Sequence, residues 1–155
     1  MALRLGLYGL AFYYESPRKP QVESRGLRIL TAGPKGADII VSNFSEARRE
    51  TKIVLGVTQA LRHSDYKELS RKGTAICFPF AELISAHNRF AAIEKIIRNI
   101  KLCRKHHASI AIATFSQDPY IMRSPMELKG LFLTLGMDTK QVKAALGVVW
   151  GIFDK

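Results

Sequence analysis

Short, nearly continuous apolar runs separated by longer amphipathic stretches constrain the fold of this chain more than any other feature. Three such runs are rich in β-branched, aromatic and small residues: ADIIVSN at 37–43, TAICFPF at 74–80 and SIAIATF at 109–115. Strands that are covered on both faces, as in a parallel sheet, have this nearly unbroken apolar character. A fourth apolar run, at 5–14, also predicts a buried strand.

The amphipathic stretches predict helices at 66–72, 82–107, 125–135 and 139–146. The sequence Ser124-Pro125-Met126-Glu127 has the pattern of a capping box with proline at the first helical position, and Gly136 is expected to end that helix. The sequence DTKQ at 138–141 repeats the start signal, and Gly147 is expected to end the last helix. Two prolines predict a loop at 16–21, and the mixed pattern at 45–64 permits no assignment.

Strands that alternate with helices predict an α/β fold with a parallel sheet and right-handed crossovers, either open or closed into a barrel. With 155 residues, of which 47% are hydrophobic, the chain is expected to form a single domain over 1–155. Its apolar stretches are far shorter than the roughly 20 residues of a membrane helix, so no segment is expected to span a membrane. Cys77 and Cys103 lie in apolar segments and are predicted to be reduced core residues, as is typical of a cytoplasmic protein.

The chain is strongly basic. It has 24 Lys and Arg against 13 Asp and Glu, which gives a net charge of +11 and an isoelectric point of about 10.0. An excess of this size indicates a polyanionic partner, with RNA or DNA as the first candidate and an anionic membrane surface as the second. The alternative is a basic, soluble surface with no such partner.

The positive charge is concentrated in the predicted helix at 82–107. Helical geometry places Arg98, Lys101 and Lys105 within about 60° of one another, which indicates a face that could neutralise phosphates. The alternative is a solvated outer helix. From Arg89 to Lys105 the chain has one acid, Glu94, and six cations: Arg89, Lys95, Arg98, Lys101, Arg104 and Lys105. The predicted core stripe of the same helix comprises Phe90, Ile93, Ile96, Ile97, Ile100 and Cys103.

His106 and His107 follow at the end of this helix. Adjacent helical residues are about 100° apart, so a role in capping the helix is favoured over a shared metal ion. A further basic group near the start of the helix at 66–72 is diluted by Asp65 and Glu68, and helical salt bridges account for most of it. Its members are Arg62, His63, Lys67, Arg71 and Lys72.

The loop SQDPYIMRS at 116–124 is a second candidate site. It leaves the end of a predicted strand and enters a capped helix, where α/β proteins bind ligands and free N–H groups attract anions. Arg123 could bind a phosphate with two donors, and Tyr120 could stack on an unpaired base. The alternative is that Arg123 pairs with a carboxylate such as Asp118.

The sequence contains none of the motifs HxH, HExxH, GxSxG, CxxC, GxGxxG or the P-loop. Few acids and many cations are typical of a binding protein rather than a metal-dependent catalyst. We therefore expect no catalytic residue, metal or cofactor in this chain.

The run IRNIKLCRKHHASIAIATFSQDPYIMRSPMELKGLFLTLGMDTKQVKAAL at 97–146 resembles the C-terminal part of the archaeal ribonuclease P protein component 3 family. Segments at 22–30, 35–43 and 71–84 also fit the family's pattern, so the resemblance covers about 22–146. Members of the family are longer, and their first strand–helix unit has no counterpart before Leu5. The residues in corresponding places are Arg123, Pro125, Leu128, Leu135, Gly136 and Ala144.

The resemblance implies a TIM-type (β/α) barrel, shortened at the N-terminus and without a catalytic site. It also implies a protein subunit of ribonuclease P, in which the RNA removes the 5′ leader of precursor tRNA and component 3 pairs with component 2. The expected RNA-contact residues are Arg123, Arg89, Arg98, Lys101, Lys105, Arg104 and Tyr120.

Two other functions are compatible with the residues. The first is a small α/β-barrel enzyme that acts on a phosphorylated metabolite, with Arg123 and the following helix start as its phosphate site. The second is a scaffold that binds only proteins, through open strand edges.

Overall fold

The computed structural model describes residues 9–13, 28–33, 39–43, 51–55, 61–115, 120 and 122–153, and the side chains of 51–55, 61–115, 120 and 122–148. The predicted loop at 16–21 lies outside these residues, as does much of the mixed region at 45–64. In the loop at 116–124, Asp118 also lies outside them.

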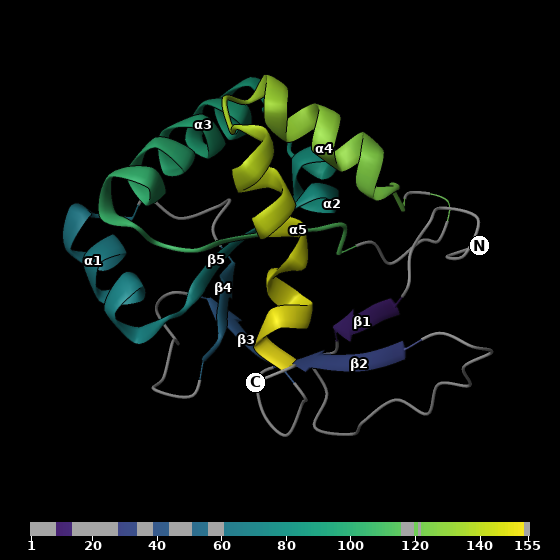
Figure 1. Cartoon of the computed structure of the whole chain (residues 1–155). Coiled ribbons are helices and arrows are strands. Elements are labelled where there is room, and N and C mark those ends of the chain that lie inside the picture. Colours follow the sequence, from purple (N-terminus) through teal and green to yellow (C-terminus); the bar gives the residue numbers. More distant parts are fainter. Residues whose placement is uncertain are drawn as a thin grey trace.

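Within the described residues, six strands follow one another in a single sheet, and each is parallel to the next (Figure 1). They are β1 Gly9–Tyr13, β2 Arg28–Gly33, β3 Ile39–Asn43, β4 Ile53–Leu55, β5 Ala75–Pro79 and β6 Ile110–Ala113. The predicted parallel α/β sheet is confirmed. A pairing of β6 with β1, which would close a barrel, is not among the strand pairs of the described residues.

The four strands predicted from apolar runs are β1, β3, β5 and β6, whereas β2 and β4 were not predicted. β4 has only three residues, IVL, and lies inside the region of mixed pattern. A run this short carries no periodicity of its own. It is a strand because β3 and β5 pair with it on either side.

The part of the chain that the structure describes also contains five helices: α1 His63–Lys72, α2 Phe80–Ser85, α3 Arg89–His106, α4 Pro125–Thr134 and α5 Thr139–Phe153. The single helix predicted at 82–107 is wrong, because the chain breaks between α2 and α3. Ala86 is extended, and the side chain of Asn88 accepts a hydrogen bond from the Ala91 N–H group at 3.0 Å, which caps α3. Asn88 therefore starts a new helix inside a continuous amphipathic pattern.

Both predicted capping boxes are present. Ser124 N–H donates to Glu127 Oε2 at 2.8 Å, and Glu127 N–H donates to Ser124 Oγ at 3.3 Å. Asp138 and Gln141 make the same reciprocal pair at 3.1 and 2.7 Å. Gly136, just beyond α4, has φ +96°, a left-handed conformation that favours glycine and stops the helix.

The predicted end of the last helix at Gly147 is wrong, because α5 continues to Phe153. A glycine inside a helix costs roughly 1 kcal/mol relative to alanine, which is less than the packing of an apolar helix face contributes. α5 contacts β6 and β3, and Val148 packs against the sheet directly after the glycine. Tertiary packing therefore carries the helix through Gly147.

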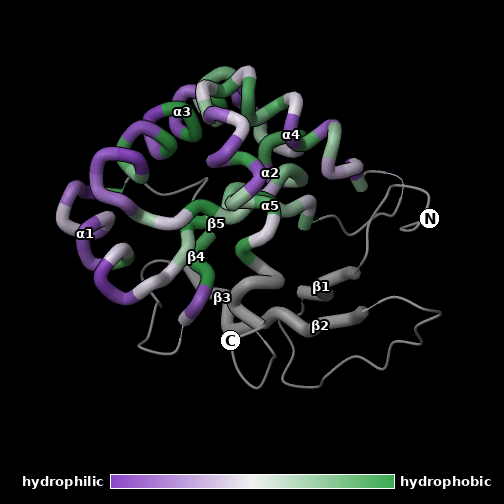
Figure 2. The backbone as a smooth tube through the Cα atoms, in the orientation of Figure 1, coloured by the Kyte–Doolittle hydropathy of each residue, from purple (hydrophilic) through white to green (hydrophobic). Residues whose placement is uncertain are grey.

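The side chains of β4, β5 and β6 alternate between two cores. Val54, Ile76, Phe78 and Ile112 belong to the large core under the helices, whereas Ile53, Ala75, Cys77 and Ala111 form a second cluster that Val148 of α5 covers. In Figure 2, β4 and β5 are hydrophobic, and α1 is largely hydrophilic. The apolar residues of α1 and α3 belong to the same buried core as those of β4 and β5.

The cysteine prediction is confirmed, since Cys77 and Cys103 are both free and buried. Burial raises the pKa of both thiols, that of Cys103 to about 12, so neither is a reactive thiolate at neutral pH.

The predicted core stripe of α3 is wrong at one position, because Phe90 is 72% exposed. The buried face of the helix is centred on Ile96, Asn99 and Cys103. Asn99 belongs to it because its amide oxygen accepts a hydrogen bond from the buried Tyr66 hydroxyl. A stripe drawn through apolar residues alone leaves Asn99 out and is rotated toward Phe90.

Candidate nucleic-acid interface

Two hydrogen bonds hold α1 against the C-terminal half of α3. Tyr66 Oη donates to Asn99 Oδ1 at 2.7 Å in the interior, and Ser70 Oγ donates to the His107 carbonyl at 3.0 Å. Burial raises the pKa of the Tyr66 hydroxyl, so it remains a donor. The outer sides of the two helices therefore form one fixed surface.

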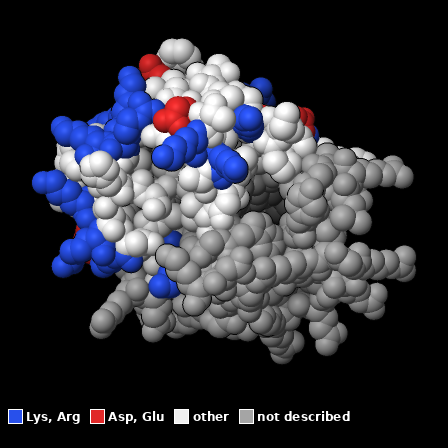
Figure 3. All heavy atoms as spheres, viewed as in Figure 1, with Lys and Arg blue, Asp and Glu red and all other residues white. Residues whose placement is uncertain are grey.

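This surface, the α1–α3 basic face, is strongly positive. Figure 3 shows Lys and Arg side chains crowded over the side of the molecule where α1 and α3 lie. Its exposed cations are Arg62, Lys67, Arg71, Lys72, Arg98, Lys101 and Lys105. Helical salt bridges were predicted to account for most of the charge near α1. This prediction is confirmed for Lys72, whose Nζ lies 2.6 Å from Glu68 Oε1, whereas Arg62, Lys67 and Arg71 make no ion pair with any described side chain.

The structure places Arg98, Lys101 and Lys105 together on the outward side of α3, as the helical spacing predicts. Among the described side chains, none of these three lies within ion-pair distance of an acid. Glu94 is on the same side, four residues before Arg98, and makes no ion pair with it. An outer helix that only faces solvent would also carry its cations on the outward side. In α3, however, no described acid compensates the charge of these three cations.

Phe90 was not predicted as part of this surface. Helical angles place it on the same side of α3 as Glu94 and Lys101, about two to four turns before Arg98, Lys101 and Lys105. An exposed aromatic ring on the same helix side as cations is a platform on which an unpaired base can stack. The sequence does contain a signal for this exposure: around the helix axis, Phe90 is about 100° or more from the centre of the buried face of α3.

Arg89 and Arg104 have other partners in the structure. Arg89 Nε donates to the Ile84 carbonyl at 3.2 Å, near the end of α2. Arg104 Nη2 donates to the Gly136 carbonyl and to Gln141 Oε1, each at 2.9 Å. Both side chains join α3 to neighbouring elements, so they are poorly placed to bind phosphate.

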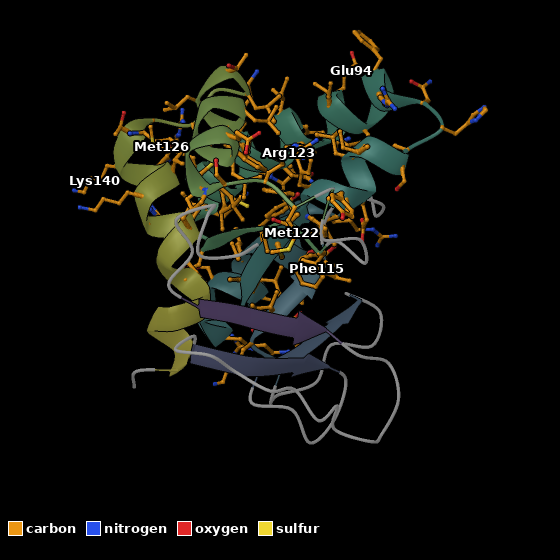
Figure 4. The ribbon with its side chains drawn as sticks, turned by 90° about the vertical axis from the view of Figure 1, so that its right-hand side faces the viewer. Glu94, Phe115, Met122, Arg123, Met126 and Lys140 are labelled. Carbon is orange, nitrogen blue, oxygen red and sulfur yellow. The ribbon has the colours of Figure 1, made fainter. Side chains whose placement is uncertain are left out.

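Arg123 is also held by the protein. Its Nη1 donates to the Met122 carbonyl at 3.2 Å and to the Tyr120 carbonyl at 3.4 Å, and its guanidinium lies 5.6 Å from the centre of the Phe80 ring. Its Nε lies 3.8 Å from Glu127 Oε1. Figure 4 shows Arg123 above Met122 and Phe115 in the middle of the molecule.

The α4 start is consequently occupied by the protein's own carboxylate. The hydrogen bond from the Ser124 N–H group holds the pKa of Glu127 below its usual value, so Glu127 is ionised at the helix N-terminus. An incoming phosphate would compete with it. Tyr120, in contrast, is 82% exposed, in keeping with the predicted stacking role.

One further group was not predicted. Glu82 lies in α2, directly after β5, and its Oε2 atom is buried without a hydrogen-bond partner. Burial raises the pKa of this carboxyl. Within the described part of the chain, no three His, Cys, Asp or Glu side chains are arranged to hold a metal ion.

The two adjacent histidines have different roles. His107 takes the left-handed conformation that ends α3, with φ 54°. Its N–H group donates to the Arg104 carbonyl at 3.5 Å, and the next N–H group, that of Ala108, donates to the Cys103 carbonyl at 3.0 Å, so the predicted capping role of His107 is confirmed. For His106 that prediction is wrong, because its ring faces α1, where its Nε2 atom lies 2.9 Å from Nδ1 of His63.

Comparison with solved structures reveals a similar fold. A chain in the cryo-EM structure of archaeal ribonuclease P with mature tRNA matches 98% of this chain and 83% of its own length, with a TM-score of 0.85 and 16% sequence identity. At this identity the likeness shows a shared fold. No family model matches the sequence. No curated protein matches it either.

Among the helices that the structure describes, none has the length and apolar character needed to cross a membrane.

Proposed function

We propose that this chain is a non-catalytic, RNA-binding protein subunit of ribonuclease P, equivalent to component 3, built as one TIM-type barrel-like domain. One observation carries the proposal. The α1–α3 basic face bears uncompensated cations on a fold that is shared with a chain of an archaeal ribonuclease P structure. The expected partners are ribonuclease P RNA, component 2 and other protein subunits, and precursor tRNA indirectly.

In this role the protein performs no bond cleavage. Arg98, Lys101 and Lys105 neutralise RNA phosphates, and the release of counterions drives binding. The affinity therefore falls with salt, with a log–log slope of roughly −0.7 to −0.9 per neutralised phosphate. Such contacts position the RNA and carry little sequence information.

The seven predicted contact residues divide into two groups. Arg98, Lys101 and Lys105 are unpaired within the described residues and are assigned to phosphates, and the exposed Tyr120 to base stacking. Arg89, Arg104 and Arg123 already have protein partners. Of these three, Arg123 is the best secondary contact, because its pair with Glu127 is long and partly exposed.

The experiment measures binding to ribonuclease P RNA, with component 2 present, over a salt series. Replacement of Arg98, Lys101 and Lys105 by Gln is expected to weaken binding at low salt and to make the slope shallower by about two to three. A charge-matched control replaces Lys52, Lys140 and Lys143, three exposed lysines that belong to neither α1 nor α3; Figure 4 shows Lys140 well separated from Glu94 of α3. Equal losses in both variants would contradict the proposal.

Restored cleavage of the 5′ leader by the RNA is the functional readout. The wild-type chain and the Lys52, Lys140 and Lys143 control should support it, and the Arg98, Lys101 and Lys105 variant should not. Absence of salt-dependent RNA binding by a folded wild-type chain would instead favour a scaffold that binds only proteins.

The alternative is an α/β enzyme that acts on a phosphorylated metabolite, and one observation favours it. The buried carboxyl of Glu82, with its raised pKa, lies directly after a parallel strand, where such enzymes place acid–base groups. Binding of phosphorylated metabolites that Glu82→Gln abolishes, with no gain from long RNA, would support this function. The occupied start of α4 weakens the phosphate site that it was predicted to use.

A further inference from the structure

A pair of histidines joins α1 and α3 within the α1–α3 basic face. His63 Nδ1 and His106 Nε2 are 2.9 Å apart, and the two rings meet edge to face, with centroids 5.2 Å apart and planes at 81°. The Tyr66 ring stacks on the other side of His106 at 6.2 Å and 22°. Packing on α1 therefore fixes the His106 ring, while His63 remains exposed.

A hydrogen bond between two imidazoles requires one N–H donor and one free lone pair. The pair is therefore intact when it is neutral or carries one extra proton. A second proton makes both facing nitrogen atoms donors and breaks the bond. The number of bound protons thus determines how many donors the pair offers to an incoming anion.

The groups around the pair are almost all cationic. Partial burial lowers the pKa of His106, and so does the positive charge of His63, Lys105, Lys67 and His107. Arg98, Lys101 and Lys105 add positive charge along α3, and Arg62 precedes α1.

The nearby acids are turned to other partners. Asp65 accepts hydrogen bonds from the Arg62 N–H group and the Ser64 hydroxyl, and Glu68 pairs with Lys72. The strand β5 behind α1 offers only the buried thiol of Cys77, and the acid of α2, Glu82, has a buried carboxyl oxygen. Within the part of the chain that the structure describes, an anion is therefore the missing complement of this site.

We propose that His63 and His106, with Lys67 and Lys105, form a binding site for a backbone phosphate of RNA, and that occupation of this site takes up a proton. The inference rests on the proposed RNA-binding function and adds the site and its dependence on pH. The phosphate accepts hydrogen bonds from the protonated pair, and its negative charge offsets the repulsion from the lysines.

The sign of the pH dependence follows from linkage. Bound RNA raises the pKa of His106 from its lowered value, so the complex holds more protons than the free protein does. The RNA affinity then rises as the pH falls through the histidine range, by up to about tenfold per pH unit for one linked proton. Lysine–phosphate contacts alone would give no such dependence there, because lysine remains charged.

The test uses the full-length chain and a generic RNA hairpin at constant ionic strength. Affinities are measured between about pH 6 and about pH 8, and NMR follows the imidazole signals with and without RNA. Wild-type protein is expected to bind more tightly at low pH and to show an RNA-induced rise in the pKa of His106. His106→Gln and His63→Gln are expected to lose this pH dependence, so that the affinity of each variant is nearly equal at about pH 6 and at about pH 8.

The matched control is His87→Gln, which removes an exposed histidine outside the α1–α3 basic face and should behave as wild type. Circular dichroism establishes that each variant is folded. RNA binding with no pH dependence, or a dependence retained in both His106→Gln and His63→Gln, would overturn this inference and leave the proposed function intact. Failure of the wild-type chain to bind RNA at any pH in low salt would overturn both.

Discussion

Arg104 of α3 donates from the same Nη2 atom to the carbonyl of Gly136, 32 residues away, and to the side chain of Gln141. This contact ties the basic helix to the connection between α4 and α5. A charged donor on a main-chain carbonyl contributes about 1–3 kcal/mol. We expect Arg104→Gln to lower the free energy of unfolding by about 1–2 kcal/mol, measured by denaturant titration.

The same variant separates the structural role of Arg104 from the role of its neighbours. Its RNA affinity and salt slope, compared under conditions where it is folded, should match wild type, whereas Lys101→Gln should change the slope and leave stability unaltered. A reduced slope in Arg104→Gln would show that Arg104 contacts phosphate as originally predicted.

Gly147 lies inside α5, and a Cβ atom added there would meet no atom within 4 Å. Gly147→Ala is therefore expected to stabilise the protein by about 1 kcal/mol, visible as a higher midpoint of unfolding. Gly136→Ala is the control with the opposite sign, because Gly136 has φ +96°. Destabilisation by Gly147→Ala would indicate that α5 ends before this position.

Glu94 opposes the field of the α1–α3 basic face without pairing to any of the described cations. Glu94→Gln is expected to tighten RNA binding about two- to fivefold at low salt, since exposed charge interactions are worth up to about 1 kcal/mol. The gain should disappear at high salt. Glu94→Asp keeps the charge and serves as the control; an equal gain from it would exclude electrostatics as the cause.

Phe90 is an exposed aromatic residue on the cationic side of α3. Phe90→Ala is expected to weaken binding of single-stranded RNA by about 1–3 kcal/mol, with little effect on duplex RNA or on the melting temperature. Phe90→Tyr should retain the affinity. Phe132→Ala, at a residue only 1% exposed, should instead lower stability by about 3–5 kcal/mol. Equal weakening of single-stranded and duplex binding by Phe90→Ala would argue against stacking.

Glu82 makes stability depend on pH in an unusual direction for a carboxyl group. Burial raises its pKa in the folded protein, so the neutral form is favoured there. The resulting stabilisation is present below its ordinary pKa, near 4.5, and is lost as the pH rises through the raised value. Glu82→Gln should be more stable than wild type at neutral pH, and its free energy of unfolding should depend less on pH. An equally steep pH dependence in the variant and in wild type would refute this account.

Motifs that span only four consecutive residues predicted the local structure correctly. The capping boxes at Ser124–Glu127 and Asp138–Gln141 need only short-range hydrogen bonds, and both are present. Predictions failed where packing decided the outcome. Gly147 is helical because α5 packs on the sheet, and β4 is a strand because its neighbours pair with it.

The candidate site shows the same division. The common face of Arg98, Lys101 and Lys105 follows from helical periodicity alone. The partners of Arg104 and His106 lie 32 to 43 residues away in the sequence, so no local pattern indicated them. The capping role of Glu127 was predicted, but the ion pair between its carboxylate and Arg123 was not.

The side of the sheet that faces α5 is lined along β5 and β6 by Ala75, Cys77, Ala111 and Ala113, all small side chains, and Val148 of α5 packs against them. On this side of the sheet the chain's own helix covers the strands. The outward sides of α1 and α3, in contrast, carry solvent-facing residues that can be exchanged without repacking these strands. A change in partner could therefore evolve on this scaffold at little cost in stability.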